Sequence, residues 1–196
     1  MPSKKISILI FVLSLIVNGC KNDDEIVYSP KPKGYPRIFF PEKNYRSFDS
    51  LCPFRFDIPD YSAITNDKHN NAEPCWYNLN FPNFNATLHI SYKEINNNVL
   101  DYIEDSHNFA NRHQIKATGL DETVIMRDSA KVYGLLFDIA GNTASSVQFY
   151  VTDSSKHFLR GALYFNSVPN TDSLKIVVDY LRKDVLQLIN TVAWKK

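Results

Sequence analysis

Apolar and polar residues alternate along several short stretches of the chain, and this period of two predicts β-strands. In FRFDIP (residues 54–59), the apolar side chains of Phe54, Phe56 and Ile58 fall on one face. CWYNLNF (75–81) and ATLHISYK (86–93) are separated by PNFN, a turn-rich connection that favours a hairpin. Three more stretches of this kind are KVYGLLFDIAG (131–141), SSVQFYVTDS (145–154) and HFLRGALYFN (157–166). The pattern therefore predicts six strands.

Two other stretches repeat apolar residues every three or four positions and are predicted to be amphipathic helices. The first covers residues 99–117 after an N-cap at Asn98; its apolar stripe is Val99, Ile103, Phe109 and Ala110. The second and clearer helix follows a cap at Thr171 or Asp172. Its stripe is Leu174, Val177, Val178, Leu181, Val185, Leu188, Ile189 and Val192, and Lys175, Arg182, Lys183 and Asp184 lie off the stripe.

Strands, a helix, more strands and a final helix predict an α+β fold in which two main helices pack on an antiparallel sheet. The length suits one domain, which we assign to residues 37–196. The order of the elements is similar to that of the compact sandwich of PsbP- and Mog1-like domains. Such a likeness concerns the fold and not the function.

The N-terminus predicts export and a membrane anchor. Lys4 and Lys5 precede ISILIFVLSLIV (6–17), whose twelve residues would span roughly 18 Å as a helix, too little for a hydrocarbon core of about 30 Å. This is typical of a secretory signal. VNGC (17–20) is similar to a bacterial lipobox, so we expect cleavage after residue 19 and lipidation of Cys20; ordinary cleavage with a free Cys20 is the alternative.

Residues 20–36 are predicted to be a proline-rich tether, because Pro30, Pro32 and Pro36 disfavour a helix. The aromatic and basic residues in and after it are candidates for binding a partner: Tyr28, Tyr35, Arg37 and Lys43. Charge reversal at Arg37 and Lys43 is then expected to disturb a complex and leave the fold intact. The alternative is a spacer that packs on its own domain.

Composition favours a binding surface. Aromatic residues make up 13% of the chain, and those in GYPRIFFPEKNYRSFD (34–49) lie outside any clear strand or helix, which predicts an exposed aromatic patch. After removal of residues 1–19, 20 basic side chains face 21 acidic ones. This balance argues against nucleic acid or an anionic bilayer surface as a partner.

Cys52 and Cys75 remain once Cys20 is assigned to lipid, and an exported pair favours a structural disulfide. The bridge would close a loop of 22 residues and stabilise the fold by about 3 kcal/mol. A redox pair would be expected to have CxxC spacing, and zinc would need further ligands that the sequence does not supply.

The sequence holds no glycine-rich phosphate loop, GxGxxG or GxSxG motif, and we expect no cofactor and no metal. Ser145 or Ser146 with Asp153 and His157 could form the triad of an envelope hydrolase, provided that they converge. Turn and strand preferences explain the same residues without catalysis. A small-ligand carrier is a third hypothesis, and it requires an aromatic-lined pocket of roughly 300 Å³ or more.

Long motifs resemble the gliding-motility lipoprotein GldD family of Bacteroidota. They are YSPKPKGYPRIFFPEKNYRSFDSLCPFRFDIPDYS, CWYNLNFPNFNATLHISYKEI, KVYGLLFDIAGNTASSVQFYVTDSSKHFLRGALYFNSVPNTDS and the closing WKK. The resemblance implies an envelope lipoprotein required for gliding and type IX secretion, with other gliding lipoproteins and secretion components as partners. It assigns the lipid to Cys20, and Cys52 and Cys75 match the cysteines of its CPF and CW motifs. It brings no catalytic residue, so the leading hypothesis is a non-enzymatic assembly or stabilising factor.

The side of the membrane is left open by the sequence. An outer-membrane anchor facing the periplasm is favoured. KNDDE (21–25), however, is similar to the lysine-and-acid signal that sends some lipoproteins to the cell surface, so surface display is the alternative.

Overall fold

The computed structural model describes residues 37–112, 117–166 and 171–195, with the side chains of 171–173 excepted. Contacts divide the chain after residue 37, and all the elements below belong to the unit of residues 38–196. The predicted signal peptide and tether lie outside the described residues, so their assignment stays a prediction.

Within the described residues, ten strands form two antiparallel sheets. The larger has seven strands in the order β3 (Ala63–Asn66), β4 (Tyr77–Phe81), β5 (Ala86–Glu94), β9 (His157–Phe165), β8 (Ser145–Thr152), β7 (Val132–Gly141) and β6 (Ala117–Arg127). The smaller has the order β1 (Tyr45–Asp49), β2 (Phe54–Pro59) and β10 (Ala193–Trp194). Short 3₁₀ turns at Pro82–Phe84 and Asp128–Ala130 connect β4 to β5 and β6 to β7. The structure confirms the predicted α+β class and all six predicted strands.

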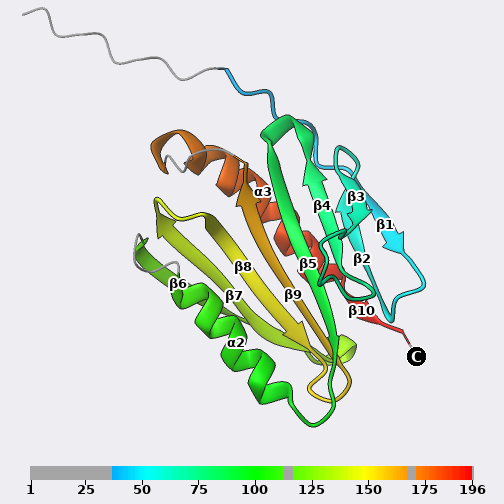
Figure 1. Ribbon diagram of the computed structural model, residues 1–196. Helices are drawn as coiled ribbons and strands as arrows, with labels where there is room; N and C mark the ends of the chain where they lie inside the picture. The colour runs from blue at the N-terminus through cyan, green and yellow to red at the C-terminus, as the bar shows by residue number, and fades with distance from the viewer. Residues whose placement is uncertain (1–36, 113–116, 167–170, 196) are drawn as a thin grey trace, which may run out of the picture. The chain divides into compact units, whose positions relative to one another are not determined.

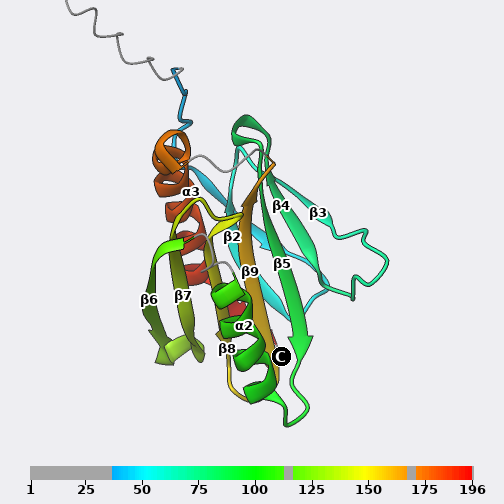
Figure 2. The same cartoon turned by 60° about the vertical axis from the view of Figure 1, so that its left-hand side comes forward.

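The two helices lie on opposite faces of the larger sheet (Figures 1 and 2). Helix α2 (Val99–Arg112) packs on β8 and β9, whereas α3 (Thr171–Thr191) lies on the other face and also packs on β2. The smaller sheet therefore shares its side of the larger sheet with α3.

The main core lies between the larger sheet and the layer formed by α3 and the smaller sheet. Strand alternation explains its composition, because Phe54, Phe56 and Ile58 of β2 are all buried, whereas Arg55 is exposed. Six members of the predicted α3 stripe are buried: Val177, Leu181, Val185, Leu188, Ile189 and Val192. A smaller cluster under α2 contains Ile95, Ala110, Phe137, Ile139, Tyr150 and Phe158.

Three details of the helices differ from the prediction. Helix α2 ends at Arg112, and Ala117, predicted to be helical, begins β6. The buried positions of α2 are Ser106 and Ala110, while Phe109 is 41% exposed and lies outside the stripe. Asp184, predicted to lie off the α3 stripe, is only 2% exposed because residues from the N-terminal part of the unit cover it.

Strands β1, β3, β6 and β10 were not predicted. Strands β3 and β10 have only four and two residues, and β6 has a burial pattern without regular alternation. The predicted aromatic patch is also wrong in part, because Phe40 stacks on Phe84 and Phe48 packs on Phe56 and Tyr77. Among residues 37–49, which the structure describes, Phe39 is 81% exposed and is the large apolar residue that stays open to solvent.

Candidate functional site

The residues of the hypothetical hydrolase triad do not come together. Ser145 begins β8, while Asp153 and His157 flank the turn that follows the other end of this strand. Seven residue steps of about 3.3 Å place the two groups roughly 23 Å apart. A nucleophilic serine must hydrogen-bond to its base, so the hydrolase that uses Ser145 or Ser146 with these partners is excluded.

Asp153 and His157 have structural roles instead. The Asp153 carboxylate accepts backbone N–H bonds from Ser155, Lys156 and His157 at 3.0, 2.8 and 2.9 Å, which closes the β8–β9 turn. Burial raises the pKa of Asp153, but these donors outweigh it and lower the pKa to about 2. The His157 ring stacks on Trp194 and shares a 2.8 Å hydrogen bond with the Tyr92 hydroxyl.

The two paired cysteines join the smaller sheet's β1–β2 connection to the segment before β4. A disulfide links Cys52 to Cys75, whose Cα atoms are 5.7 Å apart. The Cys52 sulfur also lies 3.0 Å from the Tyr77 hydroxyl, inside the main core. The bridge thus connects the two sheets at a buried point, as a structural disulfide would.

Lys43, a candidate for partner binding, is bound inside its own domain. Its ammonium group lies 2.7 Å from the Asp184 carboxylate, donates to the Tyr61 hydroxyl and the Tyr180 carbonyl at 2.9 Å, and sits 3.3 Å from the centre of the Tyr180 ring. Tyr45 and Tyr61 donate to the same carboxylate. Burial and hydrogen bonding to Asp184 raise the pKa of both phenols.

These contacts argue against the expectation that charge reversal at Lys43 leaves the fold intact, because a glutamate there would face Asp184. Arg37 is exposed and remains a candidate for binding a partner. Tyr28 and Tyr35 lie outside the described residues.

Strand β6 forms one edge of the larger sheet and is eleven residues long. It pairs with β7 along its length, with one irregularity between Ala117 and Gly119. Val124 and Met126, two positions apart and hence on the same face, are 68% and 69% exposed. The opposite edge, β3, has only four residues. Among the described residues, β6 is therefore a long edge strand without a second strand partner, and exposed apolar side chains lie beside it.

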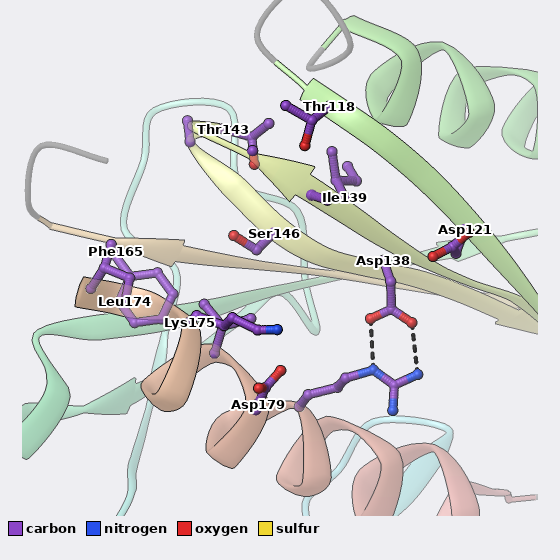
Figure 3. A pocket seen from close by; sticks show the side chains of 15 residues that line it. Thr118, Asp121, Asp138, Ile139, Thr143, Ser146, Phe165, Leu174, Lys175 and Asp179 are labelled. Carbon is purple, nitrogen blue, oxygen red and sulfur yellow. Dashed lines mark hydrogen bonds and ion pairs between the residues drawn. The ribbon is translucent and has the colours of Figure 1, made fainter. Parts of the chain in front are cut away.

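A polar pocket of about 430 Å³ opens between the β6–β8 end of the sheet and the first turns of α3 (Figure 3). Its main feature is a two-bond ion pair in which Arg182 donates to both carboxylate oxygens of Asp138 at 2.7 Å. This hydrogen bonding raises the pKa of Arg182. The pair is already satisfied internally, and Phe165 is the one aromatic residue in the lining. This pocket does not match the aromatic-lined cavity expected of a small-ligand carrier.

A second pocket, of about 470 Å³, lies between α2 and the larger sheet on the face away from α3. We call it the aromatic pocket, since five of its lining residues are aromatic: Trp76, Tyr102, Phe109, Phe158 and Tyr164. Its size and lining match the requirement stated for a small-ligand carrier.

Two of the polar groups in the aromatic pocket, His89 and Arg160, come from β5 and β9. His89 lies on the polar face of β5 and shares a 2.6 Å hydrogen bond with Asn78 of the neighbouring strand β4. Burial lowers its pKa. Arg160 of β9 donates to Gln148 of β8 at 2.7 Å, and its guanidinium carbon lies 4.6 Å from the centre of the Phe109 ring.

Arg160 is a site residue that the sequence analysis did not identify. The sequence feature that could have drawn attention to Arg160 is its position as a charged residue in the middle of an apolar strand, HFLRGALYF. That signal does not reveal a pocket, because the opposite wall comes from α2, some fifty positions earlier in the chain.

Among the residues that the structure describes, no three or more histidine, cysteine, aspartate or glutamate side chains gather where they could hold a metal ion. No helix in the same ranges is long and apolar enough to cross a membrane.

The fold and these surface features define an antiparallel α+β sandwich that has an exposed edge strand and an aromatic pocket. Residues 25–194 match the family model described as gliding motility lipoprotein GldD, so the chain belongs to that family. The match covers most of the chain and confirms the resemblance drawn from its motifs. The protein is thus a gliding motility lipoprotein, attached to the cell envelope by lipid.

Comparisons with curated proteins and with solved structures add little to this assignment. No curated protein matches the sequence. Among solved structures, cyanobacterial PsbP (CyanoP) from Synechocystis sp. PCC 6803 is similar, with a TM-score of 0.48 and 11% identity. The match covers 79% of this chain and 94% of that one. We infer nothing about function from it.

Proposed function

We propose that this gliding lipoprotein acts without catalysis, as an assembly or stabilising factor for the gliding apparatus and the type IX secretion machinery. The edge strand β6 carries the proposal. An unpaired strand edge offers a row of backbone donors and acceptors to an extended segment of another chain, and neighbouring side-chain positions supply specificity.

Several properties of β6 support this use. Soluble proteins protect sheet edges with short strands, bulges or inward-pointing charges. The opposite edge follows that rule with its four residues, whereas the eight residues of β6 from Leu120 to Arg127 pair with β7 without any irregularity. At about 3.4 Å per residue, this is enough for a partner segment of roughly 27 Å. Val124 and Met126 would be covered by such a partner.

The test introduces lysine at the edge, through V124K and M126K together. Intact cells carrying this variant or the wild type are crosslinked, the lipoprotein is recovered, and co-purifying gliding and secretion components are quantified. Colony spreading and release of a type IX substrate are scored in parallel. We expect loss of the co-purifying components with normal amounts of folded lipoprotein, because lysine at an edge opposes strand addition.

Leu100 provides the matched control. It is 75% exposed on α2, away from the edge, and L100K makes the same change from an apolar to a cationic side chain. Co-purification and spreading should be normal in L100K. Unchanged recovery of partners in the V124K/M126K variant would refute β6 as the binding surface.

We further propose that the lipid on Cys20 anchors the protein in the outer membrane with the domain in the periplasm. The lipobox-like VNGC supports the anchor. External protease added to intact cells should then leave the domain undigested, whereas permeabilised cells should lose it. Digestion in intact cells would assign the protein to the cell surface and give KNDDE the role of an export signal.

A further inference from the structure

We propose that the aromatic pocket binds a small organic carboxylate with an apolar or aromatic body, and that Arg160 holds the carboxylate. This is a ligand-binding function separate from the strand edge, because the pocket lies beside α2 and β5 while β6 is at the sheet's outer edge.

Arg160 is the first reason. Among the described residues, no carboxylate forms an ion pair with Arg160, and the exposed Asp105 acts on it only through longer-range attraction. The guanidinium donates a hydrogen bond to the neutral Gln148. Burial lowers the pKa of this guanidinium. A partly buried cation without a directly paired carboxylate is costly, and an incoming anion would reduce that cost.

Gln148 adds a second polar group beneath Arg160. Its side chain is 1% exposed, and its oxygen is taken by the guanidinium. Its buried Nε2 has no hydrogen-bond partner in the part of the chain that the structure describes. The interior next to Arg160 therefore contains donors in excess of acceptors, which is the arrangement expected around a site for an anion.

The side chains that line the aromatic pocket indicate that the part of the ligand beyond the carboxylate is apolar. Trp76 and Phe158 come from the sheet side, and Tyr102 and Phe109 come from α2, so an apolar body would be enclosed between aromatic faces. The volume of about 470 Å³ lies within the range for small-molecule sites. Phe109, whose ring lies over Arg160 and is partly exposed, covers the charged end.

The remaining charges around the pocket point to a single negative charge. Lys93 is already paired with Glu73, and Asp67 with His69. Asp105 is exposed on the α2 side of the lining, where it would repel a ligand of higher charge. One planar guanidinium matches one carboxylate, whereas a phosphate dianion would leave a charge uncompensated.

Such a carboxylate could belong to a free organic acid or to the C-terminus of a peptide. The experiment separates these sources with two pairs of probes: 3-phenylpropanoate and its amide, and the peptide Gly-Gly-Phe with a free or an amidated C-terminus. The full-length chain, purified in mild detergent, is titrated with each probe and followed by the indole N–H signals in a nitrogen–proton NMR spectrum.

Two tryptophans make the readout specific. Trp76 lines the pocket and donates its indole N–H to the Tyr92 carbonyl, whereas Trp194 lies outside the lining and donates to the Lys131 carbonyl. We expect at least one acid to shift the Trp76 signal saturably, with a midpoint below about 1 mM, and the Trp194 signal to stay in place. Response to the free acid alone assigns the ligand to small molecules. Response to the peptide acid alone assigns it to a peptide terminus.

The variants test the role of Arg160. R160Q should weaken binding at least about tenfold, because a charge-assisted bond to the carboxylate is lost. F109A, at a partly exposed position that a folded chain should tolerate, should weaken it severalfold, and L100A on the same helix should bind as the wild type does. If R160Q fails to fold, F109A and the acid–amide comparison decide. Equal binding of acids and amides, or no saturable Trp76 shift with any probe, would overturn the proposal.

Discussion

Replacement of Asp184 by asparagine tests whether this buried carboxylate holds the segment around Lys43 and Tyr45 onto α3. The carboxylate is 2% exposed and accepts from Lys43, Tyr45 and Tyr61. Asparagine keeps the size of the side chain and removes its charge. Lys43 then remains partly buried next to a neutral group.

The size of the stability loss expected for D184N depends on how exposed the partners of Asp184 are. Removing one member of a fully buried ion pair costs about 3–5 kcal/mol. The Lys43 side chain is 24% exposed and would keep its bond to the Tyr180 carbonyl, so part of its charge stays solvated. We therefore expect a loss of about 2–3 kcal/mol in the free energy of unfolding. For a domain of this size, that corresponds to a fall in Tm of about 4–12 °C.

The assay is urea denaturation followed by circular dichroism, with thermal unfolding as a second measure. Asp179→Asn is the matched control, because Asp179 is an exposed carboxylate on the same helix. It should change the stability by less than about 0.5 kcal/mol. Equal stabilities for D184N and D179N would refute the view that the Lys43–Asp184 cluster supports the fold.

Three further perturbations have defined outcomes. Changing Cys52 and Cys75 to serine together should lower the unfolding free energy, measured in urea, by about 3 kcal/mol relative to the oxidised wild type. Equal values for the variant and the oxidised wild type would mean that the bridge does not stabilise the fold. G134A should cost about 3 kcal/mol or more, because its Cβ would overlap a backbone carbonyl of β8, whereas G119A, with 3.9 Å to its nearest neighbour, should melt close to the wild type. The pKa of Asp153 falls from 3.8 to about 2 on folding, so its stabilisation is present above pH 4 and lost as the pH falls toward 2. D153N should therefore be less stable than the wild type at pH 7 and equally stable near pH 2, and a constant difference in acid titrations would contradict this.

Lys43, Arg160 and β6 illustrate the limits of the sequence pattern. A lysine after a proline-rich stretch has the pattern of an exposed contact residue, because its acceptor, Asp184, lies 141 positions away. Arg160 was visible as a charge within an apolar strand, but the wall opposite comes from α2. Strand β6 was missed because an edge strand open to solvent has no buried face to impose alternation.

The sequence by itself determined the α+β class, the six alternating strands, the apolar stripe of α3 and the family, because these depend on local periodicity and on long motifs. Only the tertiary structure decided that the serines of β8 lie far from His157, that Lys43 belongs to the domain's interior, and that Arg160 lines an aromatic pocket. The physical reason is common to all three. Burial, ion pairing and pocket formation depend on which distant segments pack against each other, and periodicity along the chain carries no information about those partners.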